Sequence, residues 1–325
     1  MMRLIILLIA ILAGPTNAAA QSSADAEWPK RVIRFIVSAA PGSAGDTVCR
    51  IIAQKLGERL GQQLIIDNRA AAAGTIAAEG LARSAPDGYT IGMVTTSTHV
   101  IAAILNSKLT YDPIKDFAPV SMIGHSPYVL AIYPGLPVKN VAELVALAKA
   151  KPRQLNNAAF GTTSLGYLAS VLFANAAGIE INQVAYRSSA QAVLDAVAGR
   201  IEMQFSTLSP AIPLVREGKL RALATTGAKR VSSLSDIPTL AEAGIANFEV
   251  SLWIGIAAPT GTPQSIVSRL NQEMSAILAS PEIIDALLQQ GMTAEPGPPE
   301  DLGKRIGGDI VKWREAVSKV GIKAE

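Results

Sequence analysis

The first third of the chain alternates short apolar runs with segments of helical periodicity. Residues 32–37 are apolar except for Arg34, which predicts a buried strand. After a turn of small residues at 41–45, Asp46 heads a predicted helix. Its apolar face is formed by Val48, Ile51, Ile52, Leu56 and Leu60. A strand at 64–66, a helix at 75–82 and a strand at 89–95 are predicted next. Strands that alternate with helices indicate parallel sheets in an α/β protein.

A second set of alternating elements follows. Strands are predicted at 129–133, 155–159, 183–186, 203–206, 221–225 and 253–258, and helices at 141–150, 164–177, 190–198 and 211–217. Three more helices are predicted at 263–278, 281–290 and 300–320. Two α/β units in one chain suggest ligand capture between two lobes. Open α/β sheets bind ligands at the carboxyl ends of their strands, so the informative residues should lie just after strands.

The first twenty residues have the layout of a secretory signal peptide. A short basic start with Arg3 precedes an apolar run at 4–13, and small residues at 18–20 precede Gln21. The alternative is an anchoring helix, but the run is too short to span about 30 Å of hydrocarbon comfortably. We therefore expect cleavage after Ala20 and a soluble mature protein in a bacterial-type periplasm or outside the cell.

Composition excludes several classes of protein. The chain has 325 residues, enough for two domains, and 49% of them are hydrophobic, which excludes a disordered chain. A single cysteine, Cys49, excludes a disulfide framework, and its helical position predicts a buried small apolar side chain. Cys49, His99 and His125 lack the spacing of zinc ligands. A net charge of +3 is too weak to suggest nucleic acid. We expect no metal, no cofactor and no nucleic-acid partner.

The loop at residues 41–46 is the first candidate ligand site. Its small residues Ser43, Ala44 and Gly45 allow backbone N–H groups to point outward at a helix start, where an anion is favoured. A phosphate-binding P-loop is excluded because Asp46 stands where a lysine is required. The alternative is a tight turn with Asp46 as the helix N-cap, a role that is compatible with ligand binding.

A second candidate loop consists of Gly161, Thr162, Thr163 and Ser164, between a predicted strand and a long apolar helix. Three hydroxyls and the backbone N–H groups can donate to carboxylate oxygens. A nucleophile elbow centred on Ser164 is the competing reading, but Thr162 stands where that motif needs glycine. The only candidate bases, His99 and His125, are better explained as polar loop or surface residues.

Further strand ends carry polar side chains. Arg187, which follows Tyr186, could form a bidentate pair with a substrate carboxylate, or it could be a solvated surface charge. Hydroxyl side chains at Thr96, Ser97 and Ser206 could line the same cleft. Trp253 is expected to pack at the lobe junction, with ligand stacking as the alternative.

The order of short motifs resembles one family: the substrate-binding proteins of tripartite tricarboxylate transporters, also called Bug-type receptors. The resemblance spans about nine tenths of the chain. The matching segments are Trp28-Pro29, Pro41-Gly42 with Asp46, Asp67-Asn68-Arg69, Pro86-Asp87-Gly88-Tyr89-Thr90, Tyr111-Asp112-Pro113, Lys115-Asp116-Phe117, Gly161 with Thr163-Ser164, Ala198-Gly199, the run 218–224, Ile237-Pro238-Thr239, Glu242-Ala243-Gly244, Trp253 and Gly261-Thr262-Pro263.

The resemblance implies a type II periplasmic-binding-protein fold, an α/β fold with two lobes joined by crossing strands. We expect lobe 1 to comprise residues 28–126 and 250–325, and lobe 2 residues 127–249. The family implies a ligand carboxylate held by the loops at 41–46 and 161–164, and delivery to a permease with one large and one small membrane subunit. Ser43 stands where the family usually has a second glycine, and Tyr186-Arg187-Ser188 where it has Tyr-Lys-Gly, so the ligand could differ from the commoner ones.

The sequence thus predicts a monomeric, non-enzymatic receptor for a small organic carboxylate. Two alternatives stay open at this point: a receptor that presents its ligand to a sensor kinase, and a hydrolase that depends on Ser164.

Overall fold

Two mixed sheets share one long strand in the computed structural model, which describes residues 28–159, 164–186 and 189–321. The predicted signal peptide and cleavage site therefore lie outside the described residues. In the first sheet, β1 (Ile33–Val37) lies between β2 (Leu64–Asn68) and β3 (Thr90–Thr95), all parallel. Next to β3 runs the antiparallel β9 (Ser251–Pro259), which pairs with β4 (Phe117–Ile132). The two-residue β10 (Thr293–Ala294) also pairs with β4.

In the second sheet, the last part of β4 pairs with β7 (Met203–Thr207) and β8 (Arg221–Thr225), both antiparallel to it. Parallel to β7 lies β5 (Asn156–Ala159), which also pairs with β6 (Asn182–Ala185). The change of partner along β4 is abrupt: Pro127 still pairs with β9, whereas Tyr128 pairs with β7. The chain therefore passes from one sheet to the other between these two residues.

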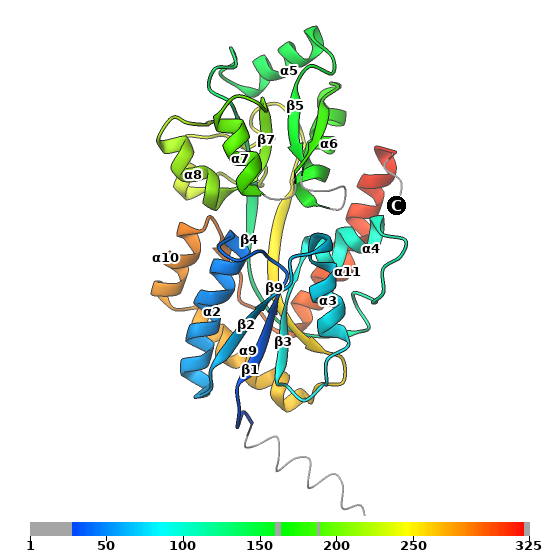
Figure 1. Cartoon of the computed structure of the whole chain (residues 1–325), viewed down its shortest axis with the longest axis vertical. Coiled ribbons are helices and arrows are strands. Elements are labelled where there is room, and N and C mark those ends of the chain that lie inside the picture. The colour runs from blue at the N-terminus through cyan, green and yellow to red at the C-terminus, as the bar shows by residue number, and fades with distance from the viewer. Residues whose placement is uncertain (1–27, 160–163, 187–188, 322–325) are drawn as a thin grey trace, which may run out of the picture.

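Helices cover both faces of each sheet (Figure 1). On the first sheet, α2 (Ala44–Leu60) and α9 (Gln264–Leu278) share one apolar cluster, and α10 (Pro281–Gln289) joins them. On its other face lie α3 (Thr75–Ala82), α4 (Ala102–Leu105) and α11 (Pro299–Lys319). The second sheet carries α5 (Val141–Ala150) and α6 (Leu165–Ala177) on one face, and α7 (Ser189–Val197) and α8 (Leu208–Arg216) on the other. The α/β fold class is confirmed.

Most predicted elements are present within two residues of their expected ends, but the first part of one strand and several short elements were missed. The prediction began a strand at 129, whereas β4 starts at Phe117. Pro119, Gly124 and Pro127 broke the apolar pattern, and the register against β9 shifts between residues 119 and 121 and between 122 and 124. A π-helical turn, η2 (Thr96–Ile101), was also missed, because a single turn has no periodicity long enough to detect.

No helix among the described residues has the length and apolarity to cross a membrane.

Candidate functional site

The carboxyl ends of both sets of strands meet where β4 and β9 cross between the sheets. In the first sheet, the last residue of β3, Thr95, pairs with Ile254 near the start of β9, and β1 runs parallel to β3. In the second sheet, the last residue of β7, Thr207, pairs with Tyr128, and β5 runs parallel to β7. The loops that follow β1, β3, β5 and β7 therefore all begin at this junction, where open α/β sheets bind ligands.

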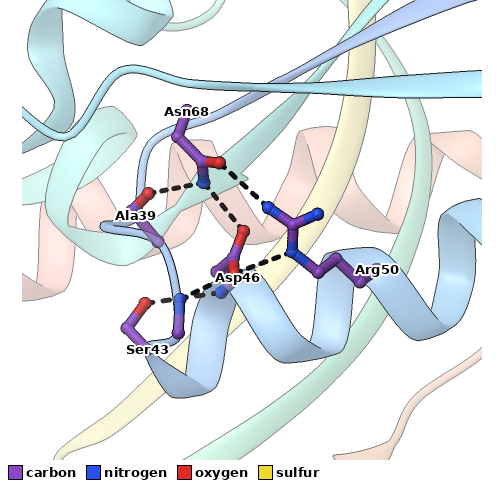
Figure 2. Close-up of polar contacts among 6 residues, drawn as sticks. Ala39, Ser43, Asp46, Arg50 and Asn68 are labelled. Carbon is purple, nitrogen blue, oxygen red and sulfur yellow. Dashed lines mark hydrogen bonds and ion pairs between the residues drawn. The ribbon is translucent and has the colours of Figure 1, made fainter.

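Asp46 organises the loop between β1 and α2 (Figure 2). Its side chain is buried, and the carboxylate accepts hydrogen bonds from the backbone N–H of Gly42 at 2.8 Å, from Nε of Arg50 at 2.9 Å and from Nδ2 of Asn68 at 2.8 Å. Burial alone would favour the neutral acid, but these donors outweigh it and hold the pKa of Asp46 below its usual value. Asp46 is therefore an anion fixed between three parts of the chain.

Asn68 and Ser43 complete this arrangement. Nδ2 of Asn68 also donates to the backbone carbonyl of Ala39 at 2.9 Å, which ties the end of β2 to the start of the loop. The N-cap of α2 is Ser43, whose hydroxyl accepts from the backbone N–H of Asp46 at 3.4 Å. The expectation that Asp46 is the N-cap is wrong: Asp46 lies three residues further on, where its carboxylate reaches back to the N–H of Gly42.

The three hydrogen bonds to the carboxylate of Asp46, called the Asp46 clamp below, leave two backbone N–H groups available as donors at the start of α2. Among the described residues, the N–H groups of Ala44 and Gly45 have no hydrogen-bond partner, and both residues are half-buried. The first N–H groups of a helix lack intrahelical partners and attract anions. Close packing fixes their position, because a Cβ on Gly45 would lie 3.1 Å from Cε of Met93 in β3. The loop can thus present two donors to one anionic group.

The second predicted loop is only partly described. Gly161, Thr162 and Thr163 lie outside the described residues, and so does Arg187. Ser164 is the N-cap of α6, and its hydroxyl accepts from the backbone N–H of Tyr167 at 3.2 Å. A second long helix therefore begins at the junction, on the other sheet.

The two candidate bases of the hydrolase alternative, His99 and His125, are both described by the structure and engaged elsewhere. His99 is fully buried, with Nδ1 3.0 Å from Oγ1 of Thr98, and its pKa is lowered by burial to about 3. The expectation that His99 is a loop or surface residue is wrong, because its π-helical turn points the ring into the core against Phe117. His125 pairs with Glu295 over 2.9 Å. Neither imidazole bonds Ser164.

Three further predicted residues are engaged in holding the framework. Oγ1 of Thr96 is buried and accepts from the backbone N–H of Trp253 at 3.0 Å. The hydroxyl of Tyr186 donates to Asp195 in α7 at 2.8 Å. Ser206 is buried in β7. In contrast, Ser97 is half-buried, and its hydroxyl bonds no other described residue.

Trp253 lies in the core at the junction, as expected. Its ring is fully buried, and Nε1 donates to Asp309 of α11 at 2.8 Å, so no face is available for ligand stacking in this arrangement. Cys49 is likewise buried, as predicted, and burial raises the pKa of its thiol.

Two elements of the site were missed from the sequence. Arg50 and Asn68 had no predicted role, although Arg50 stands four residues after Asp46 on the same helix, a spacing that places opposite charges side by side. No sequence signal links Asn68 to Asp46, because the two residues are joined only by the pairing of β1 with β2.

A family model described as the tripartite tricarboxylate transporter family receptor matches residues 48–322. Among similar proteins of known name, BugT of Bordetella pertussis is 33% identical over 316 residues, which cover 97% of each chain.

Solved structures give the same result. An R. palustris protein with adipate superposes with a TM-score of 0.88 at 35% identity, and covers 92% of this chain and 100% of its own. The periplasmic binding protein BugD superposes with a TM-score of 0.85 at 28% identity, and the match covers 92% of this chain and 100% of BugD. MatC from Rhodopseudomonas palustris with bound malate gives 0.82 at 31% identity, with 89% and 100% covered. One of these neighbours is named a periplasmic binding protein, and the other two were solved with dicarboxylates.

Proposed function

The chain belongs to the tripartite tricarboxylate transporter receptor family, a family of solute-binding receptors and not of enzymes, and from this premise we propose that it captures a small organic carboxylate. Dicarboxylates are the first class to test, since two structural neighbours were solved with adipate and malate.

The observation that carries the proposal is the Asp46 clamp. An uncompensated carboxylate near the site would repel an anionic ligand. The charge of Asp46 is balanced by Arg50, and its two oxygens accept hydrogen bonds from three donors within the protein. What the loop offers to the junction is therefore the pair of N–H groups of Ala44 and Gly45, next to Ser43. Two neighbouring N–H donors at a helix start suit the two oxygens of a carboxylate.

The second half of the site lies at the start of α6. Gly161, Thr162, Thr163 and Ser164 are proposed to donate to carboxylate oxygens from the opposite sheet. Arg187 and Ser97 are the next candidates for direct contact. Thr96, Tyr186 and Ser206 instead position the site, because their hydroxyls are bonded to protein groups or buried.

The receptor is proposed to work by closure of two lobes, residues 28–126 with 250–325 and residues 127–249. The switch of partners along β4 between Pro127 and Tyr128 supports this boundary. Ligand contacts from both lobes would stabilise the closed state. Export through residues 1–20 and delivery to a large and a small membrane subunit in the periplasm complete the proposal, which is consistent with the periplasmic neighbour BugD.

Thermal unfolding of the mature protein tests the binding function. The protein is unfolded and refolded to remove carried-over ligand, and then melted with a panel of mono-, di- and tricarboxylates and aromatic acids. A ligand that binds only the folded state at about 100 times its Kd stabilises it by about 2.7 kcal/mol. A saturable shift confined to one chemical series would name the ligand class. The absence of any shift across the panel would refute the proposal that the ligand is a carboxylate.

Two substitutions test the site. Thr163→Ala and Ser97→Ala should each weaken binding by about 1–3 kcal/mol if their hydroxyls donate to the ligand. Ser107→Ala, in the loop after α4 and away from the strand ends, serves as the matched control. Equal affinity of all three variants and the parent would refute the assignment.

A further inference from the structure

A contact away from the strand ends joins the two proposed lobes. The hydroxyl of Ser209 in α8 donates to Oε1 of Gln290, which follows α10, at 2.8 Å. α8 packs on the second sheet and α10 on the first, and Figure 1 shows the two helices on the same side of the molecule across the junction. This hydrogen bond is therefore made by one residue of each lobe.

Tight packing accompanies the hydrogen bond. Gly291 is buried, with a φ of +70°, and a Cβ placed on it would lie 2.9 Å from Cδ1 of Leu208 and closer still to its Cβ. Leu208 is itself fully buried in the apolar cluster of α8 and Val129. Glycine allows both the left-handed backbone and the close approach of the two lobes at this point.

The residues after Gly291 fix the turn rigidly to lobe 1. Met292 is buried in the apolar cluster of α2 and α9, and β10 pairs with β4 at Gly124 and His125, shortly before the chain crosses to the second sheet. Glu295 closes the segment through its contact with His125. Gln290 therefore offers its acceptor from a fixed position, and any rotation of lobe 2 about the crossing strands changes its distance from Ser209.

We propose that Ser209, Gln290 and the Leu208–Gly291 contact form a latch between the lobes, which stabilises the arrangement seen here and so sets the balance between the two states of the receptor. The inference rests on the proposed two-lobe closure. The apparent ligand affinity depends on the fraction of the receptor that is in the binding-competent state. A change in the ratio of the two states therefore changes this affinity, although the latch does not contact the ligand. Ser209 is a positioning residue in this scheme.

A distance measurement without ligand tests the latch. Spin labels are attached through Ala146→Cys in α5 and Ala276→Cys in α9, two exposed alanines on different lobes. The native Cys49 is fully buried, so labelling of the folded protein is selective for the introduced thiols. Pulsed electron paramagnetic resonance then gives the distribution of interlobe distances.

Ser209→Ala should move population out of the arrangement described here, changing the ratio of the two states by roughly two- to tenfold, as expected for one hydrogen bond. Ser209→Thr keeps the hydroxyl and should restore the original distribution. Gly291→Ala should shift it further, because the added methyl group collides with Leu208.

Gly218→Ala is the matched control for backbone strain. Its φ of +69° equals that of Gly291 within a degree, but a Cβ there would meet nothing within 4 Å. Identical distance distributions in the parent, Ser209→Ala and Gly291→Ala would overturn the latch, and so would an equal shift in Gly218→Ala and Gly291→Ala. Because no ligand is present, either result is independent of the carboxylate-binding test.

Discussion

The backbone N–H of Tyr128 donates to the side-chain hydroxyl of Thr226 at 2.8 Å, at the point where β4 leaves the first sheet for the second. The same hydroxyl donates to the carbonyl of Val250, just before β9 begins. Backbone bonds run alongside, from the N–H of Thr226 to Tyr128 and from the N–H of Val250 to Thr226. One side chain thus joins both crossing strands.

Replacement of that side chain should loosen the crossing. Thr226→Val keeps the shape but leaves the N–H of Tyr128 and the carbonyl of Val250 without a partner in a buried position, so it should cost about 1–3 kcal/mol of unfolding free energy. Thr225→Val is the matched control: its hydroxyl is also buried but bonds no group in the described part of the chain, so its loss should be neutral or stabilising. Chemical denaturation measures both. Equal effects in the two variants would contradict the role given to Thr226.

The crossing could not be predicted from the sequence, although most of the fold could. Strands and helices such as β8 and α3 have clear periodicity, and their predicted ends match the structure. The first part of β4 contains Pro119, Gly124 and Pro127, which normally indicate loops, and pairing with β9 and β10 keeps it extended. Thr226 follows a predicted strand, but nothing local indicates that it bonds to Tyr128, 98 residues away.

The candidate site shows the same limit. A helix start rich in small residues was visible at 43–46, because local composition determines it. The partners of Asp46 could not be predicted in the same way, because Asn68 is brought to it only by the pairing of β1 with β2. The sequence thus located the candidate loop, whereas long-range contacts decide which of its atoms are available.

Asp46→Asn should destabilise the protein by about 1–3 kcal/mol at neutral pH. The neutral amide no longer forms an ion pair with Arg50, and it has one acceptor oxygen instead of two. The pKa of Asp46 is lowered in the folded state, so its stabilising contribution is complete above the ordinary carboxyl pKa and is lost as the pH falls below it.

The difference in unfolding free energy between the parent and Asp46→Asn should therefore shrink between neutral pH and about pH 3. Denaturant titrations at several pH values provide the measurement. Asp285→Asn is the control, because Asp285 is exposed and bonds no other described side chain. A pH-independent difference would argue against a buried, ionised Asp46.

Gln204 should be better replaced by an apolar residue. It is fully buried in β7, and neither its amide nitrogen nor its oxygen has a partner among the described residues. Its neighbours across the strands are Ala131 and Ala158, which offer no polar atom on their side chains. Burial of an unpaired amide costs free energy, so Gln204→Leu should raise the unfolding free energy by about 1–3 kcal/mol.

The matched substitution is Gln183→Leu in β6. Oε1 of Gln183 accepts from Asn157 at 2.9 Å and from Ser170 at 3.1 Å, so its removal should destabilise the protein. Opposite signs for the two variants in denaturant unfolding are expected. A loss of stability in Gln204→Leu comparable with that in Gln183→Leu would mean that Gln204 is satisfied in solution.

His99 should make the fold sensitive to acid. Burial lowers its pKa to about 3 in the folded state, against about 6.5 in an unfolded chain, so the native protein holds the neutral imidazole. Below pH 6.5 the unfolded state binds one proton more than the native state, and stability should fall by about 1.4 kcal/mol per pH unit until the folded pKa is reached. The full contribution is present above pH 6.5.

Two substitutions separate this titration from packing. His99→Gln and His99→Phe both remove the ionisable group, but they differ in how they fill the space beside Tyr111 and Phe117, so their stabilities at pH 7 should differ. In both variants the unfolding free energy should nevertheless depend less steeply on pH between pH 3 and 6.5, and by the same amount. The reason is that neither variant can take up the proton that the unfolded parent binds at position 99. Potentiometric or denaturant titration across that range measures the slope. A slope unchanged in both variants would show that His99 is protonated in the folded protein.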